Sequence, residues 1–124
     1  MVDIPRLRRV GLRSGIPVLL ALAASLALAQ ALPGFSIVAP ADGATVQNPV
    51  VLEVALQNSV IGRPIDGLDH LHISIDGGPE VAIYLGGPIS LPPLSRGSHR
   101  IEVELAGPSH RALLPRKHIS ITVE

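Results

Sequence analysis

Hydrophobic and polar residues alternate along most of the chain after residue 34, and a period of two is typical of half-buried β-strands. The clearest case is the run 99–105, where Ile101, Val103 and Leu105 alternate with charged residues. The same pattern predicts strands at 35–38, 50–57, 70–75, 81–85, 89–91 and 118–123. After the first thirty residues, no segment keeps a helical period over ten residues. The pattern therefore predicts an all-β domain.

Proline and glycine separate these predicted strands. The segment 40–43, Pro-Ala-Asp-Gly, has the residues of a turn, and Gly or Pro interrupts the loop 58–67 at three positions. Pro92 and Pro93 exclude the short strand 89–91 from the centre of any sheet, because proline cannot donate to a sheet ladder. Short strands with such turns, over about 90 residues, are typical of an immunoglobulin-like antiparallel β-sandwich. We expect about seven strands.

The first 31 residues have a different composition from the rest. Four arginines precede an apolar run rich in Leu and Ala at 16–29, and Ala27, Ala29 and Ala31 offer A-x-A cleavage sites. We therefore expect residues 1–31 to be a helical signal peptide and residues 32–124 to be the sandwich domain, exported to the periplasm or the cell exterior.

Two alternatives to a cleaved general-secretion signal remain. A membrane anchor needs roughly 20 apolar residues, more than this run has, and only such an uncleaved leader would bring the domain to a membrane. The pair Arg8-Arg9, with Leu12 close behind it, raises the twin-arginine export route, but its flanking residues fit poorly. We favour general secretion.

Removing the leader changes the charge of the chain. The full chain has ten basic and ten acidic residues. Four of the bases and one of the acids lie before residue 32, which leaves six bases, nine acids and a net charge of −3. An acidic domain with one Tyr and one Phe lacks the basic surface and the stacking aromatics of a nucleic-acid-binding protein. With no cysteine, it must be held together by a hydrophobic core rather than by disulfides.

The run 69–78, Asp-His-Leu-His-Ile-Ser-Ile-Asp-Gly-Gly, carries the most informative side chains. Its alternation places His70 and His72 on the face opposite the core, and Asp-Gly-Gly ends the strand in a turn. If this strand lies beside 99–105 and 118–123 in one sheet, then His110 and His118 lie near the same end of the sheet. His99, at the start of its strand, lies at the opposite end, where we expect a hydrogen-bonded histidine at the edge of the core.

These positions predict a metal site. Neutral imidazole binds copper, zinc and nickel, and three histidines can hold an ion with one coordination position open. Our first choice of ligands is His70, His72 and His110, with His118 or Asp69 next and copper or zinc as the ion. Imidazole nitrogens spread over more than about 8 Å would argue against a shared ion, since metal–nitrogen bonds are near 2 Å.

A structural role for the same histidines is the alternative. H-x-H spacing alone is weakly specific. An exposed pair could simply hydrogen-bond across the sheet to Ser74, Arg100 or Glu102, and a loop histidine often binds turn backbone.

Enzymatic readings have less support. The serines lie in no nucleophile-elbow context, and Asp69 and Asp76 are about 20 Å apart at the rise of a strand, too far to act as a pair. We assign Glu102 and Glu104 to a solvated face. We therefore expect a non-catalytic binding domain whose partner is a metal ion or an envelope protein, with a purely structural or protein-interaction domain as the alternative.

The order of these motifs resembles that of small exported bacterial domains of unknown function. The resemblance covers Pro-Ala-Asp-Gly-Ala-Thr-Val at 40–46, the His-x-His-x-x-x-Asp-Gly strand at 70–77, Gly-x-His-x-Ile-x-Val-x-Leu at 97–105, and His110. It implies an exported immunoglobulin-like domain and no particular activity. The chain departs from that pattern at Arg96, where proline is usual, and at 107–109, where Gly-Pro-Ser replaces an Asp-containing turn.

Overall fold

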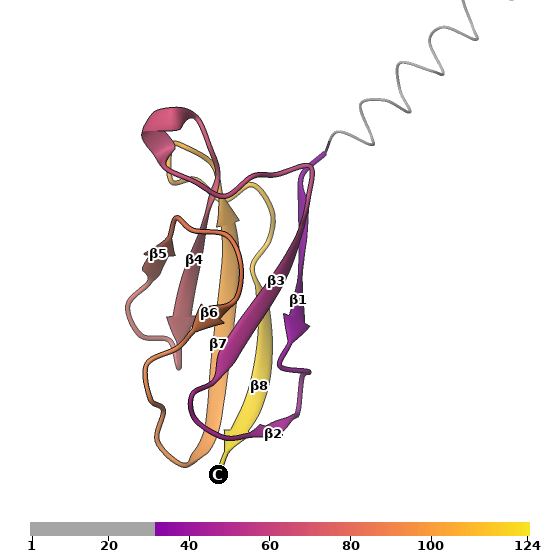
Figure 1. Ribbon diagram of the computed structural model, residues 1–124, viewed down its shortest axis with the longest axis vertical. Helices are drawn as coiled ribbons and strands as arrows, with labels where there is room; N and C mark the ends of the chain where they lie inside the picture. Colours follow the sequence, from indigo (N-terminus) through magenta and orange to yellow (C-terminus); the bar gives the residue numbers. More distant parts are fainter. Residues whose placement is uncertain (1–31) are drawn as a thin grey trace, which may run out of the picture. The chain divides into compact units, whose positions relative to one another are not determined.

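Eight strands in two sheets account for the described part of the computed structural model, which covers residues 32–124. The predicted signal peptide at 1–31 lies outside the described residues. The strands are β1 (Gly34–Ala39), β2 (Thr45–Val46), β3 (Val51–Gln57), β4 (His70–Ile75), β5 (Val81–Ile83), β6 (Ile89–Ser90), β7 (Gly97–Ala106) and β8 (Lys117–Val123). One sheet has the order β1-β3-β6 and the other β2-β8-β7-β4-β5 (Figure 1). The predicted all-β sandwich is confirmed.

The predicted neighbours of the histidine strand are also confirmed. β7 lies between β4 and β8 and is antiparallel to both, with His70 opposite Ala106 and Ile101 opposite Ile119. One strand pair departs from the expected antiparallel pattern, because β2 runs parallel to β8. β2 is only two residues long, so it carries no detectable alternation. The short β6 lies at a sheet edge, as the prolines after it require.

The core lies between the two sheets, where the inward residues of each strand meet. Leu52 of β3, Ile101 and Leu105 of β7 and Ile121 of β8 are among its most deeply buried apolar side chains. Glu53, Gln57 and the other intervening residues of β3 are exposed, so its alternation is that of a strand with one buried face.

The turn after β4 follows directly from its sequence. Asp76 and Gly77 both adopt positive φ angles, 54° and 70°, and the Gly78 N–H donates to the Ile75 carbonyl at 2.9 Å. Asp-Gly favours this pair of conformations because Gly has no Cβ and Asp tolerates the left-handed region. The turn ends β4 and directs the chain back toward β5.

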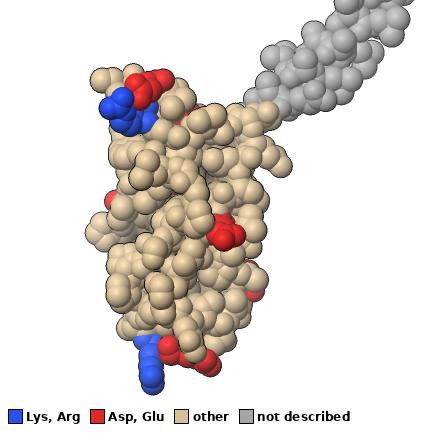
Figure 2. Space-filling model, in the orientation of Figure 1, with Lys and Arg blue, Asp and Glu red and all other residues tan. Residues whose placement is uncertain are grey.

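The described chain also has a short helical turn and, among its surface hollows, a markedly apolar groove. The turn η1 (Pro64–Asp66) is three residues long, and no helix within residues 32–124 combines the length and apolar character of a membrane span. The groove, of about 410 Å³, lies between the β4–β5 hairpin and the segment around β6, and is lined mainly by apolar residues. On the face seen in Figure 2, charged side chains are sparse and lie mostly near its two ends.

Candidate metal centre

β4 supplies two neighbouring imidazoles, but their environment differs from the predicted solvent face. His70 is fully buried, and the side chain of His72 is 12% exposed. The His70 ring is covered by Tyr84, whose ring centroid lies 5.1 Å away, and by His110, at 4.6 Å. The expectation that both histidines are exposed is therefore wrong for His70, because residues beyond β5 and β7 fold over it, and His72 is only partly exposed.

A tight turn after β7 brings the third histidine to the first two. The His110 N–H donates to the Gly107 carbonyl at 2.9 Å, and Ala106 pairs with Ala112, so the chain reverses directly beyond the strand. His110 has a φ of 63°, a left-handed conformation that histidine adopts more readily than most residues. One ligand nitrogen from each of His70, His72 and His110 lies within 4.8 Å of the other two. The predicted grouping of these three histidines is confirmed.

The closest contact in the cluster joins two ring nitrogens of β4. The Nε2 atoms of His70 and His72 are 3.0 Å apart, so without an ion one of them must carry a proton and donate it to the other. The other ring nitrogen of His70, Nδ1, is buried without a hydrogen-bond partner in the described chain. Burial, followed by the neighbouring His72 and His110, lowers the pKa of His70, which keeps its imidazole in the neutral form that binds metals.

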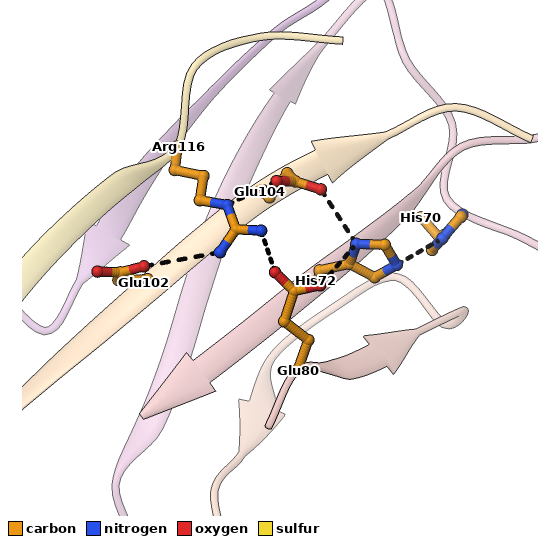
Figure 3. Close-up of polar contacts among 6 residues, drawn as sticks. All are labelled: His70, His72, Glu80, Glu102, Glu104 and Arg116. Atoms are coloured by element: carbon orange, nitrogen blue, oxygen red, sulfur yellow. Dashed lines mark hydrogen bonds and ion pairs between the residues drawn. The ribbon is translucent and has the colours of Figure 1, made fainter. Parts of the chain in front are cut away.

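A carboxylate orients His72 from the side opposite His70 (Figure 3). The Nδ1 atom of His72 lies 3.1 Å from Oε1 of Glu104, which faces it across the β4–β7 ladder. Since an ionised carboxylate only accepts, His72 donates from Nδ1 and its Nε2 keeps a free lone pair toward His70. Glu104 is therefore buried against His72, and its assignment to a solvated face is wrong.

Arg116 ties this carboxylate to two others (Figure 3). Its Nε donates to Glu104 Oε2 at 2.7 Å, a second guanidinium nitrogen binds Glu80, and the third lies 3.8 Å from Glu102. Burial acts to raise the pKa of Glu104, but hydrogen bonds from His72 and Arg116 outweigh it and lower that pKa. Glu104 in turn raises the pKa of Arg116. Glu104 is thus held ionised beside His72.

Glu80 and Glu104 also form a second group of candidate metal ligands with His72. Both carboxylates already bind the guanidinium of Arg116, which supplies the positive charge in this group. The three histidines have no such cation among them, and all three offer nitrogen. Of the two groups, the three histidines are therefore the better candidate for a metal centre.

The remaining predicted residues lie outside the histidine group. His118 is exposed on β8 opposite Glu102, and the carboxylate of Asp69 accepts a hydrogen bond from the Ser59 hydroxyl at 2.6 Å. His99 lies near the other end of β7, where Nδ1 binds Asp76 at 2.6 Å and Nε2 binds the Ser95 carbonyl at 2.7 Å. The expected hydrogen-bonded histidine at the edge of the core is confirmed.

The sequence reasoning missed Glu104 and Arg116. Glu104 could have been found, because matching the ends of the strands 70–75 and 99–105 puts its outward side chain beside that of His72. Arg116 lies in the loop before β8, where no periodicity fixes the direction of a side chain.

Comparison with known proteins adds no relative from which a function could be inferred: no protein-family model matches the chain, and no curated protein matches it.

Proposed function

We propose that this chain is an exported, non-catalytic domain that binds one divalent transition-metal ion, copper or zinc, through His70, His72 and His110. The observation that carries the proposal is the convergence of three imidazoles, with the two Nε2 atoms of β4 3.0 Å apart. Two nitrogens bound to one ion at about 2.0–2.1 Å are separated by roughly 3 Å, so an ion could take the place of the proton between these rings with little movement of the rings, the His70 proton then moving from Nε2 to Nδ1.

The surroundings of His72 support the same proposal. Metal-binding histidines almost always donate their second ring N–H to a carboxylate, a carbonyl or water, which fixes the tautomer and raises the basicity of the ligand nitrogen. Glu104 occupies that position beside His72, and Arg116 in turn holds Glu104. The arginine-rich, apolar first 31 residues support export.

A structural or protein-interaction domain is the second candidate. A specific observation favours it. The hydrogen bonds from His70 to His72 and from His72 to Glu104 need no ion, and they leave only one of the four ring nitrogens of these two histidines without a partner. In this reading, the exposed edges of the sheets meet an envelope protein.

Equilibrium dialysis of the purified protein against Cu(II) or Zn(II) tests the proposal. We expect about one ion per chain, and loss of uptake when His70→Ala and His72→Ala are combined. His118→Ala is the matched control, because it removes an exposed histidine outside the cluster and should leave uptake unchanged. Equal uptake by the double variant and the wild type would refute metal binding at this site. Co-purification of an envelope protein that persists in a chelator would favour the interaction domain.

A further inference from the structure

The imidazole of His99, near the start of β7, has an acceptor beside each of its two ring nitrogens. Nδ1 lies 2.6 Å from Asp76 Oδ2, and Nε2 lies 2.7 Å from the Ser95 carbonyl oxygen. Asp76 is ionised at neutral pH, since the Arg100 N–H and then His99 lower its pKa, so both oxygens can only accept. A neutral imidazole has one N–H for these two acceptors, whereas the imidazolium has two. The contacts are therefore those of a protonated His99.

The two acceptors belong to segments that line different walls of the apolar groove. Asp76 begins the turn that continues through residues 78–79, beside the β4–β5 hairpin. Ser95 follows residues 91–92 in the segment that leads from β6 in one sheet to β7 in the other. Residues 78–79 and 91–92 all line the groove. The protonated ring of His99 thus fastens a segment of one wall to a segment of the other.

A second anchor holds the same segment from the other sheet. The Asn48 side chain, just before β3, donates from Nδ2 to the Leu94 carbonyl at 2.8 Å and accepts from the Leu94 N–H with Oδ1 at 3.0 Å. An amide side chain does not titrate, so this anchor keeps its hydrogen bonds at any pH at which the fold persists. Of the two anchors, only the one at His99 depends on a proton that a change of pH can remove.

Asp76 is the main charged partner of His99. Its hydrogen bond, followed by that of the Ser95 carbonyl, raises the pKa of His99, so the imidazolium persists above the ordinary value of about 6.5. The residue opposite His99 on β8 is the apolar Ile121. Further charged residues lie on β7 and on the neighbouring segments, and Arg100 and Glu102 among them bind each other. These residues are Asp42, Arg96, Arg100, Glu102 and Glu124.

We propose that His99 is a pH-sensitive latch, independent of the metal centre, that fastens Ser95 to Asp76 when protonated and releases the Ser95 carbonyl when it loses a proton. The neutral ring keeps its remaining proton on Nδ1, because the carboxylate of Asp76 is a stronger acceptor than a carbonyl. Nε2 then has a free lone pair, and the Ser95 hydroxyl, whose oxygen is 3.3 Å away, donates to it. Ser95 thus exchanges a carbonyl contact for a weaker hydroxyl contact, and the segment beside the groove loosens while Asn48 still holds Leu94.

Heteronuclear NMR of the isotope-labelled, metal-free, full-length protein between about pH 5 and about pH 9 tests the latch. At the acid end both ring nitrogens of His99 should carry protons, and at the alkaline end only Nδ1 should. The Arg96 amide nitrogen is bonded to the Ser95 carbonyl carbon, so its chemical shift reports the hydrogen bond of that carbonyl. We expect the Arg96 signal to shift with the same midpoint as the ring nitrogens of His99.

Three variants separate the parts of the latch. His99→Gln should abolish the pH dependence of the Arg96 signal. Ser95→Ala should match the wild type at the acid end, where the carbonyl is bound, but make the Arg96 amide more mobile at the alkaline end, where no hydroxyl remains for Nε2. Asn48→Ala is the matched control, because it removes the other anchor of the segment and should loosen Leu94 equally at both ends.

Three results would overturn the proposal. A His99 ring that is already neutral at about pH 5, or that keeps both protons at about pH 9, is no latch in this range. A neutral ring with its proton on Nε2 would keep the Ser95 carbonyl and give up Asp76, which is the reverse of the exchange. An Arg96 signal that ignores the titration of His99 would show that the segment is not fastened by the ring. The wild-type titration decides these points even where a variant fails to fold.

Discussion

The substitution Glu104→Gln tests how much the carboxylate that hydrogen-bonds His72 Nδ1 contributes to metal affinity. Glutamine keeps the size of the side chain and an oxygen that can accept from His72 Nδ1, but it removes the negative charge. Its amide group must then face the Nε donor of Arg116, which now lies 2.7 Å from a carboxylate oxygen. The change therefore weakens the orientation and the basicity of His72 without removing any metal ligand.

Two magnitudes follow from these contacts. Loss of a supporting carboxylate typically lowers metal affinity 10–100-fold, which is about 1.4–2.7 kcal/mol of binding free energy. The metal-free protein should also lose about 1.5–3 kcal/mol of unfolding free energy, because the hydrogen bond between Glu104 and Arg116 is charge-assisted and the Glu104 side chain is only 9% exposed.

The assay is a titration of Cu(II) in competition with a chelator of known affinity, together with urea unfolding of the metal-free protein. Glu102→Gln is the matched control. Glu102 lies on the same strand and contacts Arg100 and Arg116, but it is not grouped with the histidines. We expect its metal affinity to stay within about twofold of the wild type, well below the effect of a lost supporting carboxylate. Equal affinities for the two variants would refute the reasoning, because Glu104 would then have no effect through His72.

Three further predictions concern the rest of the domain. Asp76 raises the pKa of His99, so the stabilisation from this pair is lost as the pH rises from about 6.5 through the folded pKa of His99. The Arg100 N–H and then His99 lower the pKa of Asp76, so the same stabilisation is also lost as the pH falls below about 4. The cost of His99→Gln, measured by urea unfolding, should therefore be greatest near pH 5 and smaller at pH 8.5, and a cost independent of pH would contradict this. Leu52→Ala should lower the unfolding free energy by about 2–5 kcal/mol, and Val51→Ala, on the exposed face of β3, by less than about 0.5 kcal/mol; similar losses would show that the register is wrong. His110→Gly should leave the metal-free protein as stable as the wild type, or up to about 1 kcal/mol more stable, while weakening Cu(II) binding, because glycine relieves a left-handed backbone; clear destabilisation would refute strain at this position.

Most of the sheet that carries the site could be predicted from its sequence. The alternation at 70–75, 99–105 and 118–123 reports which side chains face the core, and its regularity is enough to place these three strands together. The predicted proximity of His110 to the first two histidines required only that the loop after residue 106 return over the end of the sheet, which it does.

The burial of His70 could not be predicted in the same way. Alternation indicates which face of a strand is turned away from the core, but not whether another segment covers that face. Tyr84 lies just beyond the end of β5 and His110 lies in a loop, and neither position belongs to a repeating pattern. The parallel pairing of Thr45 and Val46 with β8 was equally hidden, since two residues are too few to show a period.

The left-handed turn at His110 and the β4 pair make metal binding at the proposed centre depend on folding. His72 and His110 are 38 positions apart in the sequence, so an unfolded chain offers an ion only the local pair on the future β4. Closing a loop of that length costs about 3 kcal/mol of chain entropy. Formation of the β4–β7 ladder and the turn at 107–110 offsets this cost in the metal-free folded chain. An ion at the proposed centre would consequently meet a chelator that is already closed, and its full affinity would be available only to the folded chain.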